Sequence, residues 1–171
     1  MIDLNHKIPP GDIQRAAVTL WQARPYFPKE TVFLVVVDPG VGTSRRAMIA
    51  QKNGHTFVGP DNGVFSFVLN KQDQARELTN PDLMLPTPRS TFHGRDIFAH
   101  AVQGIPASSF GKSFQDLVWL PDPKVDPASP GILHGEILHA DHFGNLLTSL
   151  GQFFNAQPGK WQLKPWRGNQ K

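Results

Sequence analysis

The sequence predicts an α/β fold: an N-terminal, sandwich-like α/β domain with a mainly parallel central sheet, followed by the start of a smaller β-rich domain. Residues 31–37 form an apolar, β-branched run, which is typical of a strand buried on both faces of a parallel sheet. Residues 13–21 place apolar side chains at helical spacing, as in a helix that covers such a sheet. Residues 121–130 are rich in proline and mark a domain boundary.

Length and composition exclude several classes of function. The 171 residues allow one good-sized domain with a small appendage, and the absence of cysteine excludes disulfides, cysteine–zinc sites and thiol nucleophiles. The net charge of +3 is mild and the basic residues are not clustered, so we expect no nucleic-acid partner. No apolar run approaches the roughly 18 residues that span a membrane, and no signal-peptide core opens the chain. We therefore expect a cytoplasmic protein without membrane association.

The first domain is expected over residues 1–120, and its first elements are a short strand and a helix. The strand is predicted at residues 2–4. Asp12 suits a helix start, because its carboxylate can accept the hydrogen bonds of the first N–H groups. The apolar stripe that follows ends at Trp21, and Pro25 terminates the helix.

A β-hairpin is predicted after the buried strand. Residues 47–50 and 56–58 are its arms, and Asn53-Gly54 between them is a strong turn signal. Residues 64–69 are mostly apolar and predict a short, buried helix.

A further helix and the second domain complete the expected order. An apolar stripe over residues 97–102 predicts a helix with His93 near its N-terminus, where the helix dipole lowers the pKa of an imidazole. The linker at residues 121–130 leads into a partial β-rich domain, residues 131–171, in which two apolar arms flank a polar loop at residues 139–145.

Four glycine-flanked polar loops are the candidates for a functional site: residues 38–45, 61–62, 93–96 and 141–145. Asp38 directly follows the buried strand, and open α/β sheets bind ligands beyond the carboxyl ends of their strands. Each loop alone is equally compatible with an ordinary turn that binds nothing. Their convergence on one site is therefore a prediction that the fold tests.

Four motifs in these loops, taken in order, resemble one known family. They are Val-Val-Asp-Pro-Gly-Val-Gly-Thr-Ser-Arg-Arg at 36–46, Pro-Asp-Asn-Gly at 60–63, Thr-Phe-His-Gly-Arg-Asp at 91–96 and Asp-x-Phe-Gly-Asn at 141–145. Together they resemble the S-adenosyl-L-methionine (SAM) hydroxide adenosyltransferases, which are water-using relatives of the SAM-dependent fluorinase and chlorinase.

The resemblance implies hydrolysis of SAM to adenosine and L-methionine, by in-line attack of water or hydroxide on the ribose C5′. The family's Asp-Arg-His triad corresponds to Asp38, Arg45 and His93. We expect Arg45 to stabilise developing hydroxide, and we assign His93 and Asp38 to orienting and deprotonating the water without choosing between them. Because the halogenating relatives lack the full triad, the resemblance favours hydroxide over halide.

The resemblance also implies substrate contacts and an assembly. Asn62, Asp141, Phe143 and Asn145 are the expected substrate-binding residues, with Asn145 at adenine, Asp141 at the methionine end and Phe143 against the base. A homotrimer with sites at its subunit interfaces is implied. No cofactor is expected, because SAM is the substrate.

Two departures from the family pattern bear on activity. The chain is expected to lack the family's opening strand with its Thr-Asp-Phe-Gly segment, and to stop early in the second domain. It would then keep the triad but lose part of the substrate cradle. The alternative function is therefore a catalytically inactive or fragmentary module that binds SAM or adenosine.

A metal hydrolase is a third interpretation. His134, His139 and His142 are close in sequence, but their spacing is irregular and no His-Glu-x-x-His motif is present. Exposed hairpin histidines are the favoured interpretation, and no metal site is predicted.

Overall fold

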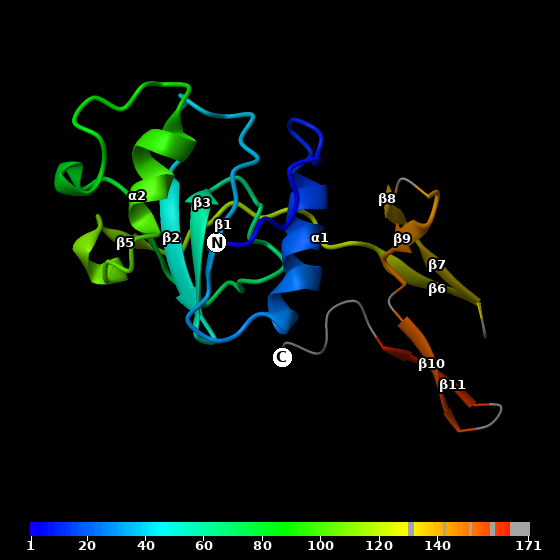
Figure 1. Ribbon diagram of the computed structural model, residues 1–171. Helices are drawn as coiled ribbons and strands as arrows, with labels where there is room; N and C mark the ends of the chain where they lie inside the picture. Colours follow the sequence, from blue (N-terminus) through cyan, green and yellow to red (C-terminus); the bar gives the residue numbers. More distant parts are fainter. Residues whose placement is uncertain (130–131, 142, 151, 158–159, 165–171) are drawn as a thin grey trace. The chain divides into compact units, whose positions relative to one another are not determined.

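The computed structural model describes residues 1–129, 132–141, 143–150, 152–157 and 160–164 (Figure 1). The chain divides into two compact units, Met1–Leu120 and Pro121–Lys171, and each is described by itself. No helix within the described ranges is both long enough and apolar enough to cross a membrane.

A five-stranded sheet forms the centre of the first unit. Its strands are β1 Val32–Leu34, β2 Ala47–Lys52, β3 His55–Pro60, β4 Ala75–Glu77 and β5 Ser113–Phe114. They lie in the order β1-β3-β2-β4-β5. β1 and β3 are parallel, whereas the other neighbours, β3 with β2, β2 with β4 and β4 with β5, are antiparallel.

The α/β class is confirmed, but the expectation of a mainly parallel sheet is wrong. Asn53 (φ 52°) and Gly54 (φ 79°) reverse the chain in two residues, as the hairpin prediction required. Such a tight turn joins antiparallel strands, since parallel strands need a long crossover. β2 therefore runs antiparallel to β3, and the pairs β2–β4 and β4–β5 are antiparallel as well.

Helix α1, Ile13–Ala23, covers one face of the sheet (Figure 1). Asp12 caps it as predicted, because its Oδ1 accepts the backbone N–H of Arg15 at 3.0 Å. Leu20 of the helix belongs to one buried cluster with Phe33 of β1 and Phe57 of β3. This face therefore carries the larger of the two apolar layers.

The π-helical segment Gly94–Phe98 and helix α2, Ala99–Ala101, cover the other face. Phe98 belongs to a second buried cluster with Ile49 of β2 and Val58 of β3. Successive strand residues point to opposite faces, which is why neighbouring positions of β2 and β3 feed different clusters. The predicted helix after His93 is thus present, in π and α form.

Two expected elements do not form. Residues 2–4 form no strand: their side chains are exposed, and no strand in the described part of the chain pairs with them. Residues 64–69 form turns instead of a helix, and the turns begin with the N–H of Ser66 bonded to the carbonyl of Gly63 at 3.0 Å. The apolar side chains of that segment nevertheless join the α1-side cluster: Val64, Phe65, Val68 and Leu69.

The second unit contains antiparallel two-stranded sheets. They pair β6 Val125–Ser129 with β7 Ile132–Gly135, β8 Ile137–Ala140 with β9 Leu146–Thr148, and β10 Gln152–Gln157 with β11 Lys160–Lys164. Because β6 lies within residues 121–130, this proline-rich stretch is more than a linker. Buried Ser149 donates its hydroxyl to the carbonyl of Lys124 at 2.6 Å and accepts the N–H of Glu136 at 2.9 Å.

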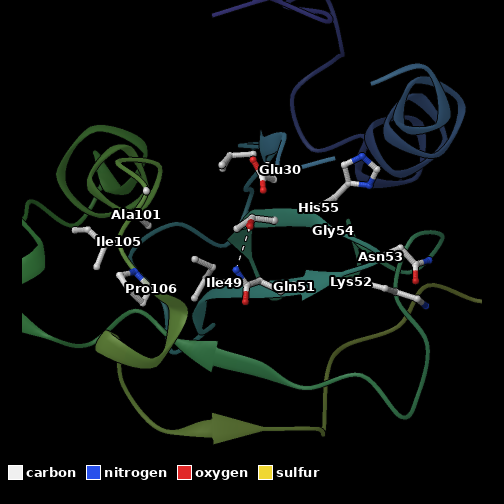
Figure 2. Close-up of a pocket in the computed structure, with 13 residues that line it drawn as sticks. Glu30, Ile49, Gln51, Lys52, Asn53, Gly54, His55, Ala101, Ile105 and Pro106 are labelled. Atoms are coloured by element: carbon white, nitrogen blue, oxygen red, sulfur yellow. Dashed lines mark hydrogen bonds between the residues drawn. The ribbon is translucent and has the colours of Figure 1, made fainter. Parts of the chain in front are cut away.

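A pocket of about 510 Å³ lies at the turn end of the β2–β3 hairpin. Figure 2 shows Ile49 and Gln51 of β2 on one side of it and Ile105 on another. Lys52 and the turn after it form its far rim. Arg45 precedes the opposite end of β2 and is not among the residues that line this pocket.

Candidate active site

Asp38, Arg45 and His93, which are distant in sequence, meet beyond the carboxyl end of β1 and are called the triad below. Arg45 donates from Nε to both carboxylate oxygens of Asp38, at 3.1 Å and 2.9 Å, and its Nη2 also bonds Oδ2. The same Nη2 lies 2.8 Å from Nδ1 of His93. The side chains of Arg45 and Asp38 are only 9% and 4% exposed. The first and third polar loops therefore converge.

The partners of His93 favour its neutral form. A guanidinium group only donates hydrogen bonds, so Nδ1 of His93 accepts from Arg45 and the neutral imidazole carries its proton on Nε2. Burial lowers the pKa of His93, and the positive charge of Arg45 lowers it further, while Asp38 and Asp96 act in the opposite direction. The pKa shift and the hydrogen bond therefore favour the same neutral form.

The loop between β1 and β2 brings Asp38 and Arg45 together by turning tightly. The N–H of Val41 bonds the carbonyl of Asp38 at 3.3 Å. Gly42 has φ +79°, and a Cβ there would lie 2.7 Å from the carbonyl oxygen of Ser90. Only glycine suits this position, and the resulting close contact joins the loop to the segment that leads to the triad histidine.

A second ion-pair group consists of Arg46, Asp61 and Asp116 and is called the Arg46 cluster below. Its arginine directly follows Arg45 of the triad in the sequence. Arg46 donates from Nε and Nη2 to Oδ2 of Asp61, at 2.9 Å and 2.7 Å, and from Nη1 to Asp116 at 2.8 Å. The Asp61 side chain is 2% exposed. Burial opposes the charge of Arg46, but the hydrogen bonds and charges of both aspartates outweigh it and raise the pKa of Arg46.

Sequence reasoning missed the groups that surround the two arginines. Cζ of Arg45 lies 5.3 Å from the centroid of the Phe98 ring, and Cζ of Arg46 lies 3.9 Å from the centroid of the Phe114 ring. Asp116 was also outside the four candidate loops. The Arg45-Arg46 pair is the sequence feature that could have predicted these groups. Successive side chains at the start of a strand face opposite sides, and each buried guanidinium needs its own partners.

Asn62 lies against the triad loop with both ends of its side chain bonded to backbone. Its Nδ2 donates to the carbonyl of Val37 at 2.9 Å, and its Oδ1 accepts the N–H of Val64 at 3.2 Å. The second polar loop therefore reaches the residue that directly precedes Asp38. A contact of Asn62 with substrate stays a prediction.

The fourth polar loop belongs to the second unit, where Asp141 organises it. Oδ1 of Asp141 accepts the N–H groups of Phe143 and Asn145, both at 2.9 Å, and Oδ2 accepts Nδ2 of Asn145 at 2.8 Å. Phe143 is 78% exposed. These bonds are those of a self-contained turn, and the substrate contacts expected of all three residues stay predictions.

The histidines of the metal interpretation do not gather with other ligands in the described residues. No group of three or more His, Cys, Asp or Glu side chains is placed there to hold a metal ion. His142 lies outside the described residues.

Comparison with known proteins gives related sequences of two activities. A protein of Salinispora arenicola named (R)-S-adenosyl-L-methionine hydrolase is 42% identical over 168 residues, which cover 92% of this chain and 64% of that protein. A fluorinase of an Actinoplanes species is 26% identical over 182 residues, covering 88% of this chain and 61% of the fluorinase. The chain thus spans less than two thirds of the length of either relative.

Structure and family comparisons agree with these relatives. The crystal structure of an uncharacterized conserved protein from Thermotoga maritima matches with a TM-score of 0.80 and 38% identity, over 87% of this chain and 60% of that one. Residues 1–115, which contain the whole triad, match the family described as the SAM hydroxide adenosyltransferase N-terminal domain. This chain therefore belongs to the SAM hydroxide adenosyltransferase family.

Proposed function

We propose that the chain hydrolyses SAM to adenosine and L-methionine, with water or hydroxide attacking the ribose C5′ in line with the departing sulfur. The observation that carries the proposal is the buried Arg45–Asp38 ion pair with neutral His93 against it. Membership of the family and the SAM hydrolase named among the relatives support the choice of substrate. A sulfonium sulfur leaves as a neutral thioether, so the reaction needs an activated nucleophile and no general acid.

In the proposed reaction, a lone pair of water forms the C5′–O bond while the C5′–S pair returns to sulfur. Arg45 and the Nε2–H of His93 donate to the attacking oxygen and stabilise its hydroxide character. This oxygen gives up one of its two protons as the C5′–O bond forms, because the 5′-hydroxyl of the product adenosine keeps only one. We assign that proton to Oδ1 of Asp38, which accepts one bond from Arg45 where Oδ2 accepts two.

This assignment chooses between the two roles that the sequence left open: His93 orients the water and Asp38 takes the proton. We further propose that Asp141, Phe143 and Asn145 contact substrate and that no cofactor takes part. The order of motifs that carries the resemblance supports both statements.

We also propose that the chain acts as a cytoplasmic homotrimer, a proposal that rests on the family resemblance. Light scattering coupled to size exclusion measures the assembly directly. The expected mass is three times that of the 19.0 kDa chain. A single-chain mass at all concentrations would contradict it.

The reaction class is tested by incubating the purified chain with SAM in ¹⁸O-labelled water. Adenosine labelled at its 5′ oxygen, beside unlabelled methionine, is the expected product pair. Release of adenine, or 5′-chloroadenosine formed in the presence of chloride, would contradict attack of water at C5′. Binding of adenosine with no product would instead favour the inactive binding module.

A further inference from the structure

The turn at residues 61–63, which follows β3, holds the start of the triad loop. Its Asn62 donates from Nδ2 to the carbonyl of Val37 at 2.9 Å. That carbonyl belongs to the peptide unit that ends at the nitrogen of Asp38. One side-chain amide thus restrains the backbone on which a triad carboxylate is mounted.

The two partners of Asn62 require an amide at this position. The carbonyl of Val37 needs a donor, and the N–H of Val64 needs an acceptor, which Oδ1 supplies at 3.2 Å. Exchanging the oxygen and nitrogen of the amide would oppose two acceptors at one end and two donors at the other. An aspartate would keep the acceptor but turn the Val37 contact into a repulsion.

This restraint acts where regular structure has ended. β1 ends at Leu34, and the last backbone bond to β3 is donated by the N–H of Val35 to the carbonyl of Val58 at 3.0 Å. Past that bond, Val37 is held by Asn62. The direction in which Asp38 leaves the sheet therefore depends on the side chain of Asn62.

The turn that carries Asn62 is itself firmly fixed. Its neighbour Asp61 is bonded by the guanidinium of Arg46 and accepts the N–H of Val118 at 2.9 Å. The N–H of Asp61 also donates to the carbonyl of Arg46 at 2.9 Å. A supporting residue is effective when its own surroundings are rigid, and Asn62 meets this condition.

We propose that Asn62 is a positioning residue, which holds the carbonyl of Val37 and thereby fixes where Asp38 meets Arg45. Its role in turnover rests on the proposed SAM hydrolysis, whereas its effect on the triad geometry does not. Misplacing a reacting group by about 1 Å can lower a rate about 100-fold. Loss of this one bond is therefore expected to act on the chemical step.

The test compares Asn62→Ala and Asn62→Asp with the matched control Asn70→Ala. Asn70 also accepts backbone N–H groups in a turn, those of Gln72 and Asp73 at 3.1 Å, but it has no bond to the triad loop. Two properties are measured: kcat and KM for SAM, and the titration of the His93 imidazole by NMR, with the signal identified from a His93→Gln variant.

In both Asn62 variants we expect kcat to fall about 10- to 100-fold with little change in KM. The His93 titration is expected to shift, because Arg45, which lowers the pKa of His93, and Asp38, which raises it, both change position relative to the ring. Asn70→Ala should change neither property. Should Asn62→Ala not fold, the isosteric Asn62→Asp carries the test.

Two results would overturn the positioning role. A raised KM with unchanged kcat would make Asn62 a substrate contact, and an unchanged His93 titration in both variants would show that the triad does not depend on it. If the wild-type chain forms no adenosine, the proposed function fails while the His93 titration still decides whether Asn62 positions the triad.

Discussion

The triad and the Arg46 cluster each surround a largely buried arginine with hydrogen-bond acceptors. In each, the guanidinium bonds a nearly inaccessible aspartate through more than one nitrogen–oxygen contact and lies over a phenylalanine ring. The difference is the third member. Arg46 adds a second carboxylate, from Asp116, whereas Arg45 adds the imidazole of His93.

Under the proposed function, that difference separates a structural ion pair from a catalytic one. Two carboxylates surround Arg46 with acceptors and raise its pKa, so its guanidinium stays charged. The imidazole beside Arg45 has a lowered pKa and a second ring nitrogen that can donate to a ligand. Burial and ion pairing are common to both arginines, so the assignment of the catalytic role to Arg45 in the proposed function depends on its titratable neighbour.

Paired Arg→Lys substitutions should give the largest difference in SAM turnover between the two arginines. Arg45→Lys keeps the charge but loses the planar set of donors that bonds Asp38 and His93 together, so turnover of SAM should fall about 100-fold or more. Arg46→Lys should lower the midpoint of thermal unfolding while leaving most of the turnover. Similar rate losses in both variants, measured as kcat/KM, would remove the distinction between the two arginines.

Within the Arg46 cluster, the two aspartates should differ in their effect on stability. Asp61→Ala removes a 2%-exposed carboxylate and leaves the N–H of Val118 without its acceptor, which should lower the free energy of unfolding by about 1–3 kcal/mol. The Asp116 side chain is 79% exposed, so Asp116→Ala should have a much smaller effect. Urea denaturation measures both, and equal losses would contradict this division.

The pH dependence should report on the triad through His93. Its folded pKa lies below the ordinary value of 6.5, so between the two values the unfolded chain binds more protons than the folded one. The contribution of His93 to stability is therefore lost as the pH falls from 6.5 through the lowered pKa.

The acid limb of kcat/KM should have its midpoint below 6.5, and a midpoint above that value would contradict neutral His93 bonded to Arg45.

The smallest expected effect is that of a chelator. The proposed chemistry uses only side-chain donors and acceptors, so EDTA should leave the rate of SAM turnover unchanged. A loss of activity with EDTA that added zinc restores would favour the metal interpretation of His134, His139 and His142.

The sequence predicted elements that depend on local chemistry. The cap at Asp12 and the hairpin turn at Asn53-Gly54 were predictable because a side chain or a positive φ fixes each one locally. The sense of the sheet was mispredicted because an apolar run does not specify which strands pair with it, and this run is not buried on both faces, since Leu34 and Val36 are exposed. The apolar residues of 64–69 are buried, as a buried helix would require, but the backbone forms hydrogen-bonded turns.

The candidate site shows the same limit. The resemblance named the three triad residues, and the fold brings them together. Asn62 bonds Val37 and Arg46 bonds Asp116, and both bonds join segments far apart in the chain. No local sequence pattern predicts such bonds. Long-range polar contacts are therefore the part of this site that required the structure.

The most direct measurement incubates the purified chain and its Arg45→Ala variant with SAM and follows adenosine and methionine by chromatography. We expect the wild-type chain to release the two products in equal amounts and the variant to release neither above the buffer background. Equal product from both proteins would show that the triad does not carry out the reaction.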